Sequence, residues 1–236
     1  MSKHFKTFAF SAILSLVCGT LLTLASTGLK SYQLKNVALD KQKNILKSVG
    51  LIDDENPPTS ETVERLFSEN IRSMNIDSAG RIVSDEKQGN HLLPVFLYVK
   101  QGRIEAYSIP VDCRGLWGRI RGYIAMKNDG KTVLGFTVYD HSETPGLGGE
   151  ISKKWFQKNF EGKHIIDGEG DFVSVSIVKG RVTDKIEADR RQNFVDGISG
   201  ASLTGKFLTQ GLKETLGSYE ALSKKFRKNE VKRIDH

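Results

Sequence analysis

A run of apolar and small residues dominates the first part of the chain. From Phe8 to Leu29 no residue carries a charge, which makes 22 uncharged positions in succession. A helix rises about 1.5 Å per residue, so this run reaches about 33 Å and can cross the hydrocarbon core of a bilayer. A cleaved signal peptide is the alternative, but the run is longer than a signal h-region and no clear cleavage site follows it. The pattern therefore predicts an uncleaved membrane anchor over residues 8–29.

The charges on either side of this run predict its orientation. Lys3 and Lys6 lie in the short segment 1–7 and favour a cytoplasmic N-terminus, although Lys30 and Lys35 follow the run. A tail this short ahead of a long domain is typical of a signal anchor whose N-terminus stays in the cytoplasm. We therefore expect the large domain to lie outside the cytoplasm.

Helical periodicity continues after the anchor. Apolar residues between 31 and 50 recur near a helical period, and Pro57-Pro58 is expected to end that unit. A second helix is expected to begin near Ser60, because apolar side chains then return at helical spacing. The stripe of this second helix comprises Val63, Leu66, Phe67 and Ile71.

Strand-like segments occupy the middle of the chain, and a long helix follows over Leu203–Leu216. The turn signal Asn128-Asp129-Gly130 predicts that the strands on either side of it form a hairpin. Strands in the middle and helices toward the ends predict an α+β domain with a central antiparallel sheet and flanking helices. The expected strands are Leu92–Val99, Ile104–Val111, Ile120–Met126, Val133–Tyr139 and Phe172–Val178.

The excess positive charge of the chain lies at its two ends. The net charge is +7, but residues 1–30 contribute +3 and residues 221–236 contribute +4, so residues 31–220 are neutral. A nucleic-acid-binding domain carries its excess positive charge on its own surface, so nucleic-acid binding is excluded.

The chain divides into a cytoplasmic N-terminus 1–7, an anchor 8–29, a juxtamembrane helix and linker 30–58, a domain 59–220 and a basic tail 221–236.

The residues that usually bind metals show no site pattern. Two cysteines cannot build a disulfide scaffold or a thiolate zinc site, and the five histidines have no ligand-like spacing. No catalytic dyad or triad stands out either. We therefore expect no metal site, and chemistry in this chain is sought in its glycine-rich loops.

The first such loop is Glu143–Glu150, which contains three glycines within Gly146–Gly149. Glycine has no Cβ, so the backbone of such a loop can approach a flat ligand closely. A plain connection between a strand and a helix is the alternative. A dinucleotide-binding fingerprint is not satisfied, because Ile151 stands where its third glycine belongs.

The second loop, Asp196–Thr204, leads into the long helix. Gly200–Lys206 matches a phosphate-binding P-loop until Phe207, where a magnesium-binding Ser or Thr is required, so a nucleotide hydrolase is rejected. Free N–H groups and the helix dipole favour an anion such as a phosphate at this helix start. Alternatively, Ser199 or Ser202 could simply cap the helix.

Together these two loops resemble a known family. Asp196-x-x-Ser199-Gly200-Ala201-Ser202-x-Thr204 resembles the acceptor motif at which a flavin transferase attaches FMN to the last Thr through a phosphoester, and Glu143–Gly148 resembles the companion loop. The chain resembles, over nearly its full length, the C subunit (NqrC) of sodium-translocating NADH:quinone reductases, an FMN-binding-domain family. The G subunit of the Rnf electron-transport complex shares both motifs and the anchor, but Gly115-Leu116-Trp117-Gly118 favours NqrC. Ser202 stands where the family usually has Thr.

The resemblance implies an electron-carrying subunit with covalent FMN on Thr204, anchored in the bacterial inner membrane with its domain in the periplasm. It implies the A, B, D, E and F subunits as partners, a flavin transferase during maturation, and electron flow from NADH toward ubiquinone coupled to Na⁺ export. A helix beginning near Ser202 would place Thr204 in its first turn, with Ser199 as the cap. A membrane-anchored assembly module without redox function remains the alternative. The remaining expected FMN contacts are Asp196, Ser199, Gly200, Ala201, Ser202, Glu143, Thr144, Leu147 and Gly148.

Overall fold

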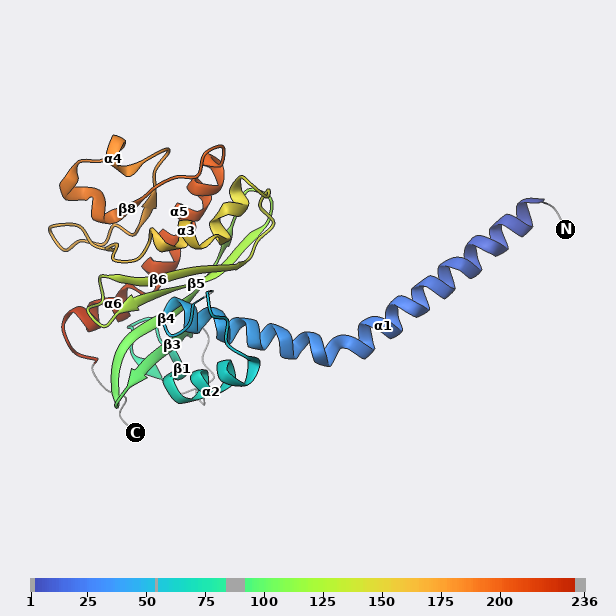
Figure 1. The fold of residues 1–236 in the computed structure, drawn as a ribbon, viewed down its shortest axis with the longest axis horizontal. Coiled ribbons are helices and arrows are strands. Elements are labelled where there is room, and N and C mark those ends of the chain that lie inside the picture. The colour runs from blue at the N-terminus through green and yellow to red at the C-terminus, as the bar shows by residue number, and fades with distance from the viewer. Residues whose placement is uncertain (1–2, 54, 84–91, 232–236) are drawn as a thin grey trace. The chain divides into compact units, whose positions relative to one another are not determined.

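A computed structural model describes residues 3–53, 55–83 and 92–231 of the chain. The chain forms two compact units, residues 1–41 and residues 42–236, which are described separately. Helix α1 (Lys3–Ser48) forms the first unit as far as Lys41, and the last turns of the same helix, from Gln42, belong to the second unit. Figure 1 shows the order of the elements along the chain.

Helix α1 is long and apolar enough to cross a membrane. The helix is continuous, so the helical periodicity expected after residue 30 belongs to the same element as the apolar run 8–29. Two hydroxyls inside the apolar run find partners within the helix. Thr20 Oγ1 donates to the carbonyl of Leu16, and Thr23 Oγ1 donates to that of Gly19, both at 2.8 Å. Because these hydroxyls are satisfied inside the helix, they add little to the cost of placing it in lipid.

Helix α2 (Ser60–Asn70) begins where the apolar spacing predicts. Thr59 caps it, because its side chain accepts a hydrogen bond from the N–H of Thr62. Ile71, expected on the apolar stripe of this helix, instead begins strand β1 (Ile71–Ile76). Strand β1 and the short β2 (Ile82–Val83) were not predicted, because β1 follows α2 without an intervening turn residue.

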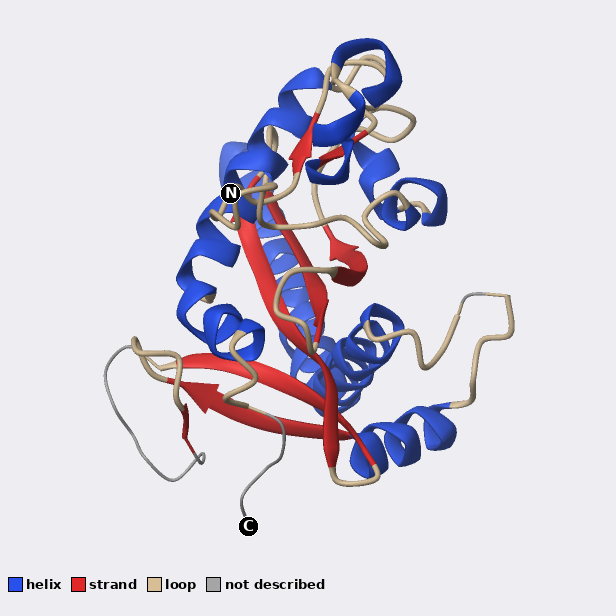
Figure 2. Ribbon diagram, turned by 90° about the vertical axis from the view of Figure 1, so that its left-hand side faces the viewer, coloured by secondary structure: helices blue, strands red, loops and turns tan. Residues whose placement is uncertain are grey.

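The second unit is built around a six-stranded antiparallel sheet with the strand order β2-β1-β3-β4-β5-β6. Its four long strands confirm the segments predicted between residues 92 and 139, and their twist is visible in Figure 2. β5 and β6 form the expected hairpin around Asn128–Gly130. The long strands are β3 (Leu93–Lys100), β4 (Arg103–Arg114), β5 (Arg119–Lys127) and β6 (Val133–Asp140).

Helix α5 (Ser202–Ser218) confirms the predicted long helix and packs on β4. Leu208, Leu212 and Leu216 lie on its buried face and join the apolar core that also holds the inner side chains of β3–β6. Burial of each such side chain stabilises the fold by roughly 1.5–3 kcal/mol. The position of α5 on the sheet determines where its first turn lies.

Short elements connect β6 to α5. The loop after β6 leads into a 3₁₀ helix η1 (Gly148–Ser152) and the short helix α3 (Lys154–Lys158). The connection continues through β7 (Ser176–Ile177), α4 (Val182–Lys185), the 3₁₀ helix η2 (Ala188–Asn193) and β8 (Phe194–Val195), and β7 pairs with β8 in parallel.

The prediction of a strand over Phe172–Val178 is wrong for most of its length. Ser174 adopts a left-handed backbone conformation with φ of 69°, which a strand cannot contain. The N–H groups of Val173 and Ser174 both donate to the single carbonyl of Ile165, instead of alternating along a partner strand. Within this range Ser176–Ile177 forms a short strand, and Phe172 makes an isolated antiparallel bridge with Ile166.

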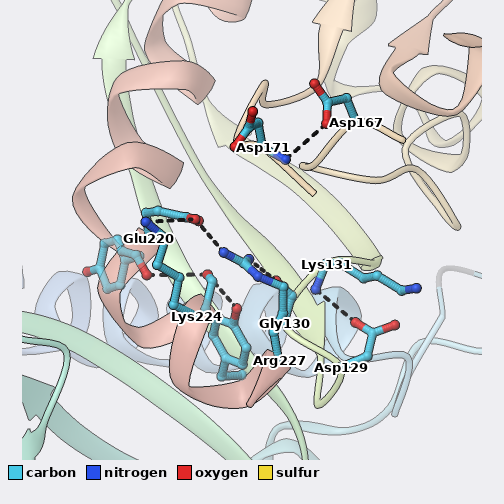
Figure 3. A network of polar contacts seen from close by, with 11 residues as sticks. Asp129, Gly130, Lys131, Asp167, Asp171, Glu220, Lys224 and Arg227 are labelled. Carbon is cyan, nitrogen blue, oxygen red and sulfur yellow. Dashed lines mark hydrogen bonds and ion pairs between the residues drawn. The ribbon is translucent and has the colours of Figure 1, made fainter. Parts of the chain in front are cut away.

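A final helix, α6 (Glu220–Arg227), packs against the β5–β6 turn, although its charge suggested part of a basic tail. Leu222 and Phe226 are buried, and the Arg227 guanidinium joins the Glu220 carboxylate to the carbonyl of Gly130, as Figure 3 shows. A Cβ at Gly130 would overlap the carbonyl of Ser223, so the turn needs glycine at this point.

Candidate functional site

The two glycine-rich loops meet at one hydrogen bond. The Thr204 hydroxyl donates to Glu143 Oε2 at 2.5 Å, although the two residues are 61 positions apart. Both side chains are buried, with 2% of Thr204 and 4% of Glu143 exposed. Thr204 lies in the first turn of α5, as predicted from the start of that helix. The Thr204 hydroxyl is therefore paired with a carboxylate at a helix N-terminus, where the helix dipole favours negative charge.

A third loop, which the sequence did not indicate as part of the site, places Glu143. The backbone N–H groups of Leu116 and Trp117 donate to Glu143 Oε1 at 2.8 and 3.1 Å. A Cβ at Gly115 would lie 2.5 Å from that same oxygen, so glycine is needed for this approach. The glycines at 115 and 118, on either side of an apolar pair, are the signal that could have indicated this loop. Its N–H groups stabilise the buried carboxylate with charge-assisted hydrogen bonds.

Gly148 lies directly against the Thr204–Glu143 pair. A Cβ there would overlap Thr204 Oγ1 and lie 2.8 Å from Glu143 Oε2. The backbone of this loop is folded by Thr144, whose carbonyl accepts hydrogen bonds from the N–H groups of Leu147 and Gly149. Thr144 itself is exposed, so its carbonyl shapes the loop while its side chain faces solvent. Gly148 is thus a site residue because of the space it leaves free.

The remaining small residues of the loop Asp196–Thr204 lie around the start of α5. Gly200 has a φ of 75°, and a Cβ there would lie 2.7 Å from Leu147 Cδ2, so the two loops touch at this point. Ser199 and Ser202 are exposed, whereas Ala201 is buried. The expectation that a serine caps the helix is wrong, because the N-cap residue is Ala201 and no side chain makes the cap hydrogen bond.

Asp196 stabilises the start of a neighbouring helix. Its Oδ1 accepts a hydrogen bond from the N–H of Val182, the first residue of α4, at 2.7 Å. This contact ties the start of the acceptor motif to the preceding connection. The structure therefore brings together Thr204, Glu143, Gly148, Leu147 and Gly200, and leaves Asp196 outside this group.

Large apolar side chains gather at the surface around this group. Among the described residues from Gln42 onward, four of the five exposed large apolar side chains belong to the three loops or the first turn of α5. Trp117 is the most exposed of them, at 69%. Exposed apolar groups clustered at one place indicate a binding surface. The four are Leu116, Trp117, Leu147 and Leu203, and the fifth is Trp155.

The part of the chain that the structure describes contains no group of three or more His, Cys, Asp or Glu side chains that could hold a metal ion. Three cavities among the described residues, of about 850, 580 and 390 Å³, are lined by residues other than Thr204 and Glu143. The exposed side chains of Trp117 and Leu147 beside the buried Thr204–Glu143 pair place this arrangement at the protein surface. It offers a buried hydroxyl, a carboxylate, free helix N–H groups and an apolar rim to a ligand that is flat at one end and anionic at the other.

Comparison with known proteins supports this description. Residues 115–217 match the FMN-binding domain family, and this range includes all three loops and Thr204. The chain is 31% identical to the C subunit of the Na(+)-translocating NADH-quinone reductase of Yersinia pestis, over 96% of this chain and 94% of that protein. The chain belongs to the NqrC family, the C subunits of Na(+)-translocating NADH-quinone reductases.

Two further comparisons agree with membership of the NqrC family. The corresponding C subunit of Pseudomonas aeruginosa is 30% identical over 96% of this chain and 97% of its own length. The crystal structure of the C subunit from Parabacteroides distasonis is 32% identical, with a TM-score of 0.70 over 83% of this chain and 96% of that one. The family resemblance and the α+β fold are thereby confirmed, and NqrC is the family in place of the Rnf-type subunit.

Proposed function

We propose that this chain is an electron-carrying subunit that holds one FMN covalently through a phosphoester to Thr204. The observation that carries the proposal is the position of the three candidate hydroxyls. Thr204 alone of these three lies inside the site formed by the three loops, whereas Ser199 and Ser202 are exposed at its edge. A phosphate on Thr204 would meet the unpaired N–H groups of the first turn of α5.

The residues present fit the flavin for two reasons. The apolar side chains of Leu116, Trp117, Leu147 and Leu203 are exposed around Thr204 and would cover the faces of a flat ring system. Gly148 leaves the space beside Oγ1 that an ester needs, because a side chain there would occupy it. FMN, when bound, supplies the capacity to accept and release electrons singly or in pairs. The exposed apolar side chains would bind and orient the ring system, and the first turn of α5 would hold the phosphate.

The wider role follows from the family. We propose that electrons pass through this subunit on the way from NADH toward ubiquinone, coupled to Na⁺ export, in a complex with the A, B, D, E and F subunits.

Residues 8–29 are proposed to remain as an anchor in the bacterial inner membrane, with the domain in the periplasm, where a covalent link prevents loss of the cofactor. Protease treatment of spheroplasts tests this topology: the domain should be digested in intact spheroplasts, and a protected domain would contradict it.

Thr204→Ala, with Ser202→Ala as its matched control, tests the attachment. The Thr204→Ala protein should be folded and anchored but carry no flavin after denaturation, because the acceptor oxygen is gone. Ser202→Ala should keep flavin fluorescence on the denatured polypeptide, since its hydroxyl is exposed two residues away. Equal flavin retention in Thr204→Ala and in the chain without substitutions would contradict the proposal. Absence of flavin from the chain without substitutions would favour the alternative, a membrane-anchored assembly module without redox function.

A further inference from the structure

The hydrogen bond between Thr204 and Glu143 has a direction. The hydroxyl is the donor and Glu143 Oε2 the acceptor, at 2.5 Å, while Oε1 is already engaged by the N–H groups of Leu116 and Trp117. The carboxylate is thus held so that one oxygen faces the hydroxyl proton. A threonine hydroxyl is a weak nucleophile until an adjacent base takes its proton, and that base must lie within hydrogen-bond reach. Glu143 meets this geometric requirement.

We infer that Glu143 is the general base that receives the Thr204 proton when FMN is attached. This inference rests on the proposed attachment at Thr204. Ester formation needs a phosphate activated as an anhydride, and flavin adenine dinucleotide is a donor of that chemical class. Thr204 Oγ1 forms a bond to the phosphorus that carries the flavin's ribityl chain, and the P–O bond of the pyrophosphate breaks. AMP leaves with the bridging oxygen, the proton moves to Glu143 Oε2, and nothing is oxidised or reduced.

Charge favours this destination for the proton. The product is a phosphodiester, which keeps one negative charge, and it is bonded to the oxygen that faced the carboxylate. Two negative charges so close together disfavour each other's ionised form. A proton on Glu143 removes that repulsion, and the resulting carboxylic acid can donate a hydrogen bond where the carboxylate accepted one. Among the described residues, no ion pair supplies Glu143 with a cation that would do the same.

A purely structural role for Glu143, as the anchor of the loop at 115–118, can be separated from the role of a base. Glu143→Gln keeps an oxygen that accepts the N–H groups of Leu116 and Trp117, so the loop stays tied. The amide nitrogen that then faces Thr204 cannot take up a proton. Glu150 provides the matched control, because it lies in the same loop region but bonds Trp155 Nε1 instead of Thr204.

The experiment measures the rate of covalent flavin incorporation into the full chain in detergent, with purified flavin transferase and flavin adenine dinucleotide. Incorporation is followed by fluorescence of the denatured polypeptide and by intact mass. Glu143→Gln should incorporate flavin at least about a hundredfold more slowly than the unmodified chain, within the range expected for loss of a general base. Glu150→Gln should match the unmodified chain. Glu143→Ala should be equally slow, and added formate should restore part of its rate by supplying a carboxylate.

Two results overturn the inference while leaving the attachment itself intact. One is a Glu143→Gln chain that melts like the unmodified protein and incorporates flavin on Thr204 within about twofold of its rate. The other is a slow Glu143→Ala chain that formate does not accelerate, because the carboxylate then serves only to hold the loop. Failure of the proposed function is recognised separately, since the unmodified chain would then acquire no flavin on Thr204.

Discussion

Gly211 of α5 lies directly against Cys113 of β4, so closely that a Cβ on the glycine would be 2.5 Å from the cysteine Sγ. Cys113 is itself buried, and burial is the main reason that the pKa of its thiol is raised to about 11. This contact sets the distance between α5 and the sheet. Because the first turn of the same helix carries Thr204, the contact also contributes to the position of the site.

Gly211→Ala should therefore push the helix away from the sheet. Overpacking of a well-packed core costs typically about 1–3 kcal/mol, and the loss should appear as a lower free energy of unfolding in urea. Gly217→Ala in the same helix is the control, because a Cβ there meets only Phe172 Cε1 and Cζ at 3.7 and 4.0 Å. Ala is the better helix former, so the control should be neutral or more stable by up to about 1 kcal/mol. Equal stability of the two variants would contradict the role of the Gly211–Cys113 contact.

Gly148→Val should impair flavin attachment while the domain still folds. Its Cβ would overlap Thr204 Oγ1, and its methyl groups would fill the space beside the Thr204–Glu143 pair. We expect a large decrease in covalent flavin per chain and an altered absorption spectrum of whatever flavin remains. Gly168→Ala serves as the control, since nothing lies within 4 Å of its Cβ position. A Gly148→Val protein with normal flavin content and spectrum would reduce this loop to a structural turn.

Two buried phenols should make the stability of the fold sensitive to alkaline pH. Burial raises the pKa of Tyr107 and of Tyr219 well above the ordinary value of 10.0. The unfolded chain then loses these protons at lower pH than the folded chain. The contribution of the two phenols to the free energy of unfolding is therefore fully present below about pH 10 and is lost as the pH rises further. Each buried tyrosine should contribute a slope of about 1.4 kcal/mol per pH unit.

Tyr107→Phe tests this alkaline dependence. The variant should lose about 1 kcal/mol near neutral pH, because the hydrogen bond of 2.8 Å between the Tyr107 hydroxyl and Ser223 Oγ is removed. Above pH 10 its unfolding free energy should fall less steeply than that of the unmodified protein, since one of the two protons no longer contributes. An unchanged slope above pH 10 would show that Tyr107 does not titrate in this way.

Local rules predicted much of the fold from the sequence. Alternation located the long strands, and apolar spacing placed the starts of α2 and α5 correctly. Alternation failed at Phe172–Val178, because the left-handed backbone of Ser174 and the shared carbonyl of Ile165 are invisible in a pattern of apolar residues. Strand β1 was missed because Ile71 fits the stripe of the preceding helix as well as it fits a strand.

The site was only partly predictable, since its central contact joins residues far apart in sequence. The motif resemblance selected both Thr204 and Glu143, but no spacing rule indicates a hydrogen bond across 61 positions. The N–H groups of Leu116 and Trp117 belong to the backbone, so only the flanking glycines at 115 and 118 mark this loop in the sequence. Ser199 had the right residue type for a helix cap, yet Ala201 occupies the cap position, because the helix begins two residues later than a Ser199 cap requires.

The central claim is that Thr204 carries the FMN, and peptide mapping of the purified full chain by mass spectrometry tests it most directly. A tryptic peptide containing residues 199–204 should carry the mass of one FMN less one water, and fragmentation should place that mass on Thr204. The same flavin mass on Ser199 or Ser202, with Thr204 unmodified, would contradict the account.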